Sequence, residues 1–212
     1  MSSGANADIA AVILAGGRAR RFDGRHKAFL PLAGKPLIAH VIARLTPQVG
    51  EMAISANERA GELARHGLPV LPDPLPGFAG PLAGVLAGLR WARGLTPRPG
   101  WLLSVAVDTP FFPPDLAARL RAAAQSAEAP LAVAASGGRR HPVFGLWALG
   151  VAGDLARALI DEDLRKIDLF TARHRLAVAD FPVHAHDPFF NINRPDDLDR
   201  AAQLARPGGR GV

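Results

Sequence analysis

Residues 9–17 read IAAVILAGG, a continuous apolar run that ends in two glycines. The run is rich in β-branched residues, which is typical of a strand buried on both faces, as in a parallel sheet. Two glycines directly after such a strand allow the backbone to approach a ligand closely and to turn N–H groups toward an anion. The stretch therefore predicts a buried first strand with a ligand site at its carboxyl end.

Strand and helix patterns alternate along the rest of the chain. Short apolar runs predict further strands at residues 52–55, 69–71, 102–107, 131–135, 143–147 and 176–181. Helical spacing and proline placement predict helices at residues 36–45, 58–66, 80–94, 114–127, 151–160 and 195–204. This order predicts an α/β fold, a mostly parallel sheet with helices on both faces and ligands beyond the carboxyl ends of its strands.

Length and composition favour a single domain. The 212 residues, 49% hydrophobic and 21% charged, suffice for one sizeable core and are few for two. We expect a disordered tail at residues 1–8, one domain at residues 9–204, and a second disordered tail at residues 205–212. There is no cysteine, no secretory signal and no apolar run of about 20 residues, so we expect a cytoplasmic protein without membrane contact.

The positive charge is concentrated in one short segment. The formal net charge is +6, and residues 14–27, LAGGRARRFDGRHK, hold four arginines and one lysine against one aspartate. The rest of the chain is close to balanced, whereas binding to a nucleic-acid duplex usually needs an extended basic stripe. This distribution argues against nucleic acid and favours a small polyphosphate ligand.

The same segment lacks the standard phosphate-loop signatures. Neither G-x-x-x-x-G-K-[ST] nor G-x-G-x-x-G occurs in it. Taken by itself, it is either a turn with solvated arginines or a phosphate site, and its charge density and its place after a strand favour the phosphate site. Lys27 is the strongest candidate in it for a phosphate contact.

Two later segments place carboxylates directly after strands. In SVAVDTP, Asp108 is either a turn or cap residue or a ligand that holds Mg²⁺ together with phosphate oxygens. In PDPLPGFAGP, Asp73 precedes a helix N-terminus at residues 80–81, which offers N–H groups to an anion or a polar edge; a plain loop and cap is the alternative.

Two further segments carry polar groups suited to substrates. Asn191 and Asn193 are two apart in FFNINRP, so they share a face of an extended segment and could bridge phosphates or ribose hydroxyls, although Asn193 equally suits a helix entry. Arg139, Arg140 and His141 follow a Gly-Gly turn and form either a site for a second anionic substrate or an ordinary basic loop.

These motifs occur in a specific order along residues 14–198. The chain contains, in turn, L-A-G-G-x-x-x-R-F-x-x-x-x-K, G-K-P-L, P-D…G-P-L-A-G, V-D-T-P-F-x-P-P-D-L, R-x-H-P and N-x-N-x-P-x-D-L. Each motif alone is weak, but the ordered set resembles the molybdenum cofactor guanylyltransferase family. The resemblance implies a Rossmann-like nucleotidyltransferase that transfers GMP from GTP to the phosphate of molybdopterin bearing molybdenum and releases pyrophosphate.

The resemblance also implies roles for individual residues. Nucleotide contacts through the backbone would come from the turn after the first strand, and the other contacts from side chains beyond it. The implied set is Leu14, Ala15, Gly16 and Gly17 for the nucleotide, Lys27 for the phosphates, Asp73 for the nucleoside, Asp108 for Mg²⁺ and nucleotide, and Asn191 and Asn193 near the reaction centre.

The chain departs from the family pattern at two positions. Ser55 stands where related sequences often carry an asparagine that contacts the nucleotide; serine can still hydrogen-bond but reaches less far. Phe22 stands where methionine is common, and both are apolar. Gly16 gives L-A-G-G, as in the guanylyl group, whereas related cytidylyl enzymes more often show L-A-A-G.

Positioning and charge neutralisation provide most of the catalysis in such transfers. We expect in-line attack by a substrate phosphate oxygen on the α-phosphorus of GTP, with Mg²⁺ on Asp108 and Lys27 stabilising the α-phosphate. Arg21, together with Arg18, would hold the leaving pyrophosphate.

Two other functions remain open on the sequence. One is transfer of another nucleotide, by a cytidylyltransferase or a sugar- or alcohol-phosphate nucleotidyltransferase of the same fold. The other is a non-catalytic carrier of molybdopterin, against which the presence of both Lys27 and Asp108 argues. Molybdoenzymes or other proteins of cofactor biosynthesis are the macromolecular partners expected.

Overall fold

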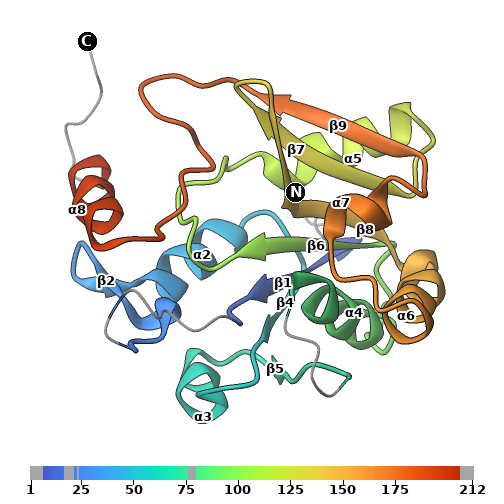
Figure 1. The fold of residues 1–212 in the computed structure, drawn as a ribbon, viewed down its shortest axis with the longest axis horizontal. Coiled ribbons are helices and arrows are strands. Elements are labelled where there is room, and N and C mark those ends of the chain that lie inside the picture. The colour runs from blue at the N-terminus through green and yellow to red at the C-terminus, as the bar shows by residue number, and fades with distance from the viewer. Residues whose placement is uncertain (1–6, 17–21, 23, 76–79, 206–212) are drawn as a thin grey trace.

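A single sheet organises the structure, a computed structural model that describes residues 7–16, 22, 24–75 and 80–205. The described residues form a 7-stranded sheet in the order β5-β4-β1-β6-β8-β7-β9 (Figure 1). The strands are β1 (Ile9–Leu14), β4 (Glu51–Ser55), β5 (Val70–Leu71), β6 (Trp101–Ala106), β7 (Leu131–Ser136), β8 (Arg139–Ala148) and β9 (Leu176–Phe181). The chain builds outward from β1 to β4 and β5, then returns to place β6 on the other side of β1.

The sheet is parallel except for one strand. β1 pairs in parallel with both β4 and β6, and β4 with β5. β8 runs antiparallel to its neighbours β6 and β7, and β7 pairs in parallel with β9. The predicted mostly parallel sheet is confirmed, and the antiparallel strand follows from the tight Gly137–Gly138 turn, which can join only antiparallel neighbours.

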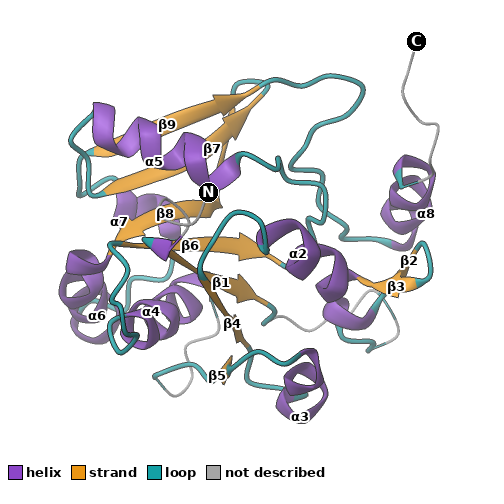
Figure 2. Ribbon diagram, turned by 180° about the vertical axis from the view of Figure 1, so that it is seen from behind, coloured by secondary structure: helices purple, strands orange, loops and turns teal. Residues whose placement is uncertain are grey.

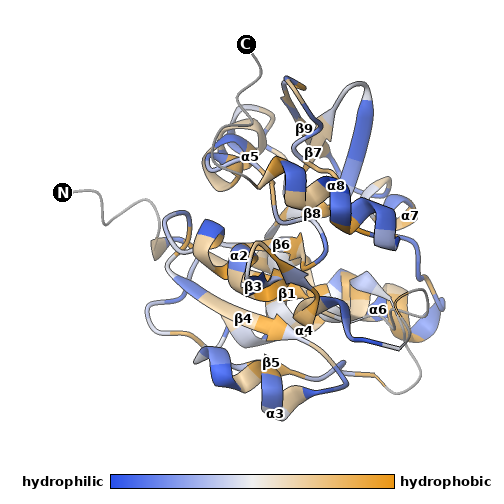
Figure 3. Ribbon diagram, turned by 90° about the vertical axis from the view of Figure 1, so that its left-hand side faces the viewer, coloured by the Kyte–Doolittle hydropathy of each residue, from blue (hydrophilic) through white to orange (hydrophobic). Residues whose placement is uncertain are grey.

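Helices cover both faces of the sheet because each strand is apolar on both sides. Along β1, Ile9, Ala11 and Ile13 face one core and Ala10 and Val12 face the other. The first core is closed by α2 (Leu37–Leu45), α3 (Ala60–Leu63) and α5 (Leu116–Ser126), and the second by α4 (Pro81–Ala92), α6 (Ala152–Asp161) and α7 (Ile167–Thr171) (Figures 1 and 2). Hydropathy follows this layering, with the central strands hydrophobic and α8 (Pro195–Leu204) largely hydrophilic (Figure 3).

α4 lies unusually close to the centre of the sheet. A Cβ on Gly84 would lie 2.6 Å from Leu14 Cδ2 and 2.7 Å from Ser55 Oγ, and one on Gly88 would lie 2.9 Å from Val12. Side chains at these two helix positions would therefore push the helix off the sheet. The two glycines seat the start of α4 against the ends of β1 and β4.

A third, smaller core joins distant parts of the chain. The hairpin of β2 (Pro31–Leu32) and β3 (Lys35–Pro36) contributes Leu32 to this core. Together with Leu30, which precedes the hairpin, it packs in one cluster with Ile192 and Ala201. The hairpin and α8 lie at the end of the molecule toward which the arrowheads of β1 and β6 point (Figure 1). The C-terminal segment is thereby held beside the loops that follow the central strands.

Most predicted elements are found within two residues of their expected bounds, and two differ by more. The helix predicted at 36–45 begins at Leu37, because Pro36 takes extended backbone and serves as its N-cap. The helix predicted at 58–66 is one α-turn, α3, followed by the 3-10 turn η2 (Ala64–His66). The strand predicted at 143–147 is the longer β8.

Several short elements were not predicted. They are β2, β3, α7 and the 3-10 turns η1 (Lys27–Phe29) and η3 (Leu149–Val151). Each spans five residues or fewer, too little for a helical or strand period to show.

The predicted tails fall largely outside the described residues. Of residues 1–8 only 7 and 8 are described, and Asp8 is held there by Gly100, whose N–H donates to Asp8 Oδ1 at 2.9 Å. Of residues 205–212 only Ala205 is described, so the domain bounds stay predictions. None of the helices in the described ranges combines the length and the apolar character needed to cross a bilayer.

Candidate active site

Four adjacent strands end in register, and the chain leaves each of them at the same edge. Leu14 of β1 is opposite both Ser55 of β4 and Ala106 of β6, and Ser55 is opposite Leu71 of β5. Two residues beyond these positions stand Gly16, Asn57, Asp108 and Asp73, respectively. The carboxyl edge thus gathers the polar residues from four separate parts of the sequence, where ligands of open parallel sheets bind.

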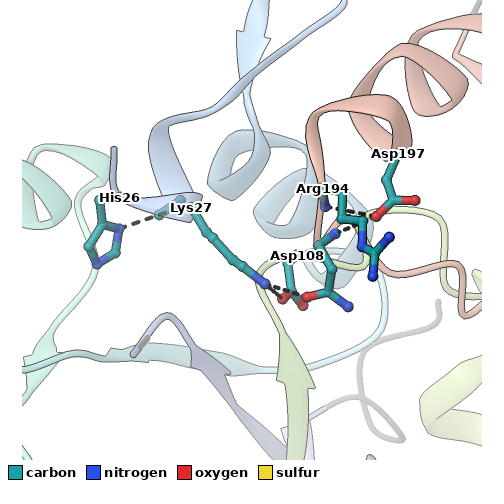
Figure 4. A network of polar contacts seen from close by, with 7 residues as sticks. His26, Lys27, Asp108, Arg194 and Asp197 are labelled. Atoms are coloured by element: carbon teal, nitrogen blue, oxygen red, sulfur yellow. Dashed lines mark hydrogen bonds and ion pairs between the residues drawn. The ribbon is translucent and has the colours of Figure 1, made fainter. Parts of the chain in front are cut away.

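Lys27 links two of the predicted segments (Figure 4). Its Nζ donates to Asp108 Oδ2 at 2.7 Å and to Asn193 Oδ1 at 2.6 Å. The Lys27 and Asp108 side chains are 19% and 15% exposed, so the ion pair is shielded but still open to a ligand. Three predicted residues, 81 and 85 positions apart along the chain, therefore form one cluster.

The segment 191–193 is fixed to the loop after β6 by its backbone. Ile192 N–H donates to the Asp108 carbonyl at 2.8 Å, and the Ile192 side chain is fully buried. Asn191 and Asn193 point the other way and are exposed, as the extended segment predicts. Asn193 is not the helix-entry residue: Arg194 is the N-cap of α8, and Asp197 accepts from the N–H groups of both residues.

Asp73 is held by a residue that the sequence reasoning missed. Asn57 Nδ2 donates to Asp73 Oδ2 at 2.6 Å, and Asp73 N–H donates back to Asn57 Oδ1 at 2.8 Å. Burial raises the pKa of the Asp73 carboxyl above its ordinary value, and the bond from Asn57 opposes this rise. The pair ties the end of β5 to the end of β4 and orients one carboxylate oxygen.

A cavity of about 470 Å³ lies over these strand ends. We call it the first cavity. It is lined by Leu14, Gly16, Lys27, Ser55, Asn57, Asp73, Gly80, Pro81, Gly84, Ala106, Val107, Asp108, Val143 and Asn191. Its wall includes the N-terminus of the 12-residue helix α4, whose first N–H groups carry a partial positive charge.

The turn after β1 offers different groups at successive residues. Ala15 is buried and its N–H donates to the Ser55 carbonyl at 3.0 Å, while the Leu14 carbonyl accepts from Val107 N–H at 3.2 Å. Gly16 is exposed, makes no hydrogen bond with another described residue, and has open space where a Cβ would lie. Of these three residues, Gly16 is the one whose backbone N–H meets no acceptor within the described part of the chain.

A second cavity of about 660 Å³ adjoins the first. The two share Ala106, Val143 and Asn191. The second cavity is also lined by Thr109, Arg139, Arg140, His141, Pro142, Phe144, Asp187, Phe189, Phe190, Asn193, Arg194 and Asp197. Arg139, Arg140 and His141 thus lie in strand β8 rather than in a loop, and they line the wall of this cavity.

A bulge in β8 shapes the wall between the two cavities. Pairing with β7 shifts after Val133, which is opposite Gly145, to Ala134, which is opposite His141. The extra residues include Val143, whose carbonyl accepts from the buried Ser104 hydroxyl at 2.7 Å. Such bulges re-aim side chains at functional sites, and this one places Val143 at the boundary of both cavities.

The Gly137–Gly138 turn determines that β8 begins at Arg139. Both glycines have positive φ, 54° and 77°, the conformation that a two-residue hairpin turn needs. Ser136, which ends β7, is opposite Arg139 in the pairing with β8. The turn therefore brings Arg139, Arg140 and His141 to the same sheet edge as Asp108.

The structure brings most predicted site residues together. The first cavity is lined by seven of them, Leu14, Gly16, Lys27, Ser55, Asp73, Asp108 and Asn191, and the second by Asn193. Ala15 lines neither, and the predictions for Gly17 and Arg21 lie outside the described residues. The missed residues include Asn57, which is two residues beyond its strand like Asp108, and Asp187, which does not directly follow a predicted strand.

Comparison with known proteins gives one consistent result. The model of the MobA-like NTP transferase domain matches residues 11–176. A molybdenum cofactor guanylyltransferase from Bradyrhizobium sp. (strain ORS 278) is 48% identical over 205 residues, covering 97% of each chain. Another, from Rhodopseudomonas palustris (strain HaA2), is 51% identical over 195 residues, covering 92% of this chain and 91% of the relative.

Solved structures agree in fold. Molybdopterin-guanine dinucleotide biosynthesis protein A from Archaeoglobus fulgidus matches with a TM-score of 0.73 and 28% identity, covering 92% of this chain and 97% of that one. A CMP:2-keto-3-deoxy-manno-octonic acid synthetase complexed with CTP matches with a TM-score of 0.70 at 14% identity, which speaks for the Rossmann-like fold alone. Since the family model covers most of the chain and curated relatives match nearly all of it, the chain belongs to the MobA-like NTP transferase family, among the molybdenum cofactor guanylyltransferases.

Proposed function

We propose that this nucleotidyltransferase transfers GMP from GTP to the phosphate of molybdopterin bearing molybdenum. The first cavity would take the nucleotide and the second the acceptor. The observation that carries this assignment is the Lys27–Asp108–Asn193 cluster, which lies where the two cavities meet. Reacting groups held in adjoining cavities meet there without a covalent enzyme intermediate.

The chemistry needs positioning and charge more than a nucleophile from the protein. An oxygen of the acceptor phosphate attacks the α-phosphorus of GTP, a new P–O bond forms, and the bond to the β-phosphate oxygen breaks to release pyrophosphate. Lys27, within reach of both Asp108 and Asn193, would stabilise the charge on the α-phosphate. We assign the β- and γ-phosphates to Arg21 and Arg18, which follow Gly16 and Gly17 in the sequence.

Asp108 fits a magnesium ion. Asp108 lines the first cavity; Lys27 engages its Oδ2, whereas Oδ1 accepts no hydrogen bond from a described residue. Magnesium is commonly held by one or two carboxylates together with substrate phosphates and waters, so one acid suffices. The ion would supply positive charge that neutralises the phosphates of the nucleotide.

The remaining contacts follow from the walls of the cavities. The Gly16 N–H and the start of α4 would meet the nucleotide, and Asp73, oriented by Asn57, would accept from N–H groups of the base or hydroxyls of the ribose. Arg139, Arg140 and Arg194 would hold the anionic acceptor. GTP is a cytoplasmic nucleotide, so we place the reaction in the cytoplasm.

Pyrophosphate release with GTP and with CTP, each with molybdenum-loaded molybdopterin and Mg²⁺, tests the nucleotide assignment. We expect faster turnover with GTP. Faster turnover with CTP would replace guanylyl by cytidylyl transfer, and use of a sugar or alcohol phosphate as acceptor would replace molybdopterin.

A carrier without catalysis is the second candidate, and Asp108→Ala separates it from the first. We expect this variant to bind molybdopterin but to transfer no GMP. If the variant still supplied a molybdoenzyme with active cofactor at the wild-type rate, the carrier function would be favoured.

A further inference from the structure

A hydrogen-bond chain on the wall of the second cavity is not used by the reaction as described. Ser136 Oγ lies 2.7 Å from His141 Nε2 and 2.8 Å from Asp187 Oδ1. Phe189 N–H also donates to Asp187 Oδ1, at 2.9 Å. Ser136 is 1% exposed and therefore lies in the core, whereas its two partners, His141 and Asp187, line the second cavity.

The hydrogen bonds of Ser136 determine which nitrogen of His141 carries the proton. A carboxylate only accepts, so the single Ser136 hydroxyl proton goes to Asp187. The Ser136 oxygen must then accept from His141, which places a proton on Nε2. In the neutral ring, Nδ1 is left as an acceptor.

The ring itself is held in place. His141 stacks on Phe189 with centroids 4.5 Å apart and planes 22° apart, and Phe189 packs edge-on against Phe144 and Phe181. Burial lowers the pKa of His141, an effect strengthened by Arg139 and opposed by Asp187, which favours the neutral ring. Among the described residues no group donates to Nδ1.

We propose that His141, oriented by Ser136 and Asp187, selects the acceptor substrate by presenting Nδ1 as a hydrogen-bond acceptor to one of its N–H groups. The ligand class is a planar heterocycle with N–H donors and an anionic group, which the pterin of molybdopterin satisfies. The three arginines of the cavity bind the anionic group, and His141 Nδ1 accepts a hydrogen bond from an N–H group of the heterocycle. This inference rests on the proposed function, because it assigns the second cavity to the acceptor.

Two isosteric changes at His141 separate its two nitrogens. Glutamine places its amide near the position of Nε2, so His141→Gln can keep the bond to Ser136 but loses the Nδ1 acceptor. Asparagine places its amide oxygen near Nδ1, so His141→Asn keeps an acceptor there but loses the bond to Ser136. Ser136→Ala removes the hydrogen bond that orients the ring but keeps the imidazole of His141. His184→Gln is the control, because His184 is exposed and lies outside both cavities.

Equilibrium binding of molybdenum-loaded molybdopterin, followed by pterin fluorescence, is the readout, with GTP binding and thermal unfolding measured on the same proteins. We expect His141→Gln to raise the Kd for molybdopterin about 5- to 10-fold, as for one lost hydrogen bond. His141→Asn should stay within about 3-fold of wild type, Ser136→Ala should lie between the two, and GTP binding should not change.

Three results would overturn the inference. One is an unchanged Kd in His141→Gln, another is equal weakening by His141→Gln and His141→Asn, and the third is a wild-type protein that does not bind molybdopterin. A wild type that binds molybdopterin through His141 yet transfers no GMP would refute the proposed function and leave this inference standing.

Discussion

The two cavities at the carboxyl edge of the sheet differ in charge. Among its described lining residues, the first cavity holds two carboxylates, Asp73 and Asp108, and one cation, Lys27. The second holds Arg139, Arg140 and Arg194 against two carboxylates, with His141 beside them. In the second cavity these arginines can neutralise the charge of an anion. In the first cavity a triphosphate needs positive charge from a metal ion on Asp108 and from the basic segment after Gly16.

Their construction also differs. The first cavity is formed by the residues that directly follow β1, β4, β5 and β6, and by the start of α4. The second is formed by a hairpin, a bulge and the segment before α8. Because the two cavities are built from separate segments, a substitution in one cavity should affect the binding of one substrate and leave the other unchanged.

Removal of Asp108 should have the largest effect. Asp108→Ala removes the proposed metal ligand and leaves Lys27 without its 2.7 Å partner, so we expect kcat to fall by at least about 100-fold. Steady-state pyrophosphate release measures it. The matched control is Asp115→Ala, at an exposed acid outside both cavities, which should keep wild-type kcat. Equal loss in both variants would remove Asp108 from the site.

An arginine of the second cavity should affect the acceptor alone. Arg140→Ala removes charge-assisted hydrogen bonds to an anion, so we expect the KM for molybdopterin to rise about 10-fold or more. The KM for GTP should stay within twofold of wild type. Arg157→Ala, at an exposed arginine that pairs with Asp154 on α6, is the control. A comparable rise in the KM for GTP would contradict the separation of the two cavities.

Alanine substitution at two glycines of the first cavity should affect different properties, the stability of the fold at one and the binding of GTP at the other. Gly84→Ala places a Cβ against Leu14 and Ser55, so we expect a loss of about 1–3 kcal/mol in the free energy of unfolding. Gly16→Ala meets open space, so its free energy of unfolding should be unchanged while the KM for GTP rises severalfold. Chemical denaturation and steady-state kinetics measure the two effects. A destabilised Gly16→Ala with normal GTP kinetics would show that Gly16 serves the fold.

The smallest expected effect is a pH-dependent one at Asp73. Because its pKa is raised in the folded state, Asp73 favours folding while protonated, and this contribution is lost as the pH rises through the folded-state pKa. Asp73→Asn keeps an acceptor for Asn57 and carries no charge. We therefore expect the variant to have a Tm about 1–2 °C above wild type at neutral pH, with the difference vanishing at acidic pH. A difference independent of pH would exclude this cause.

The sequence predicts the first cavity better than the second for a physical reason. Asp73 and Asp108 directly follow apolar runs, so their place at the sheet edge follows from the parallel order of the strands alone. Asn57 obeys the same rule, because it stands two residues after β4, although the sequence prediction for that strand end named Ser55. The second cavity depends on the register shift in β8 and on the hydrogen bond from the Ile192 N–H to the Asp108 carbonyl, which are tertiary contacts without a local pattern.

Direct guanylyl transfer is tested most sharply with GTP labelled with ³²P at the α-phosphorus, molybdenum-loaded molybdopterin and Mg²⁺. We expect the label to appear in a guanine dinucleotide of molybdopterin, with one unlabelled pyrophosphate released per product. Asp108→Ala should form none of this product. Label that stays in free guanine nucleotide, or that becomes bound to the protein instead of to molybdopterin, would contradict direct guanylyl transfer between the two cavities.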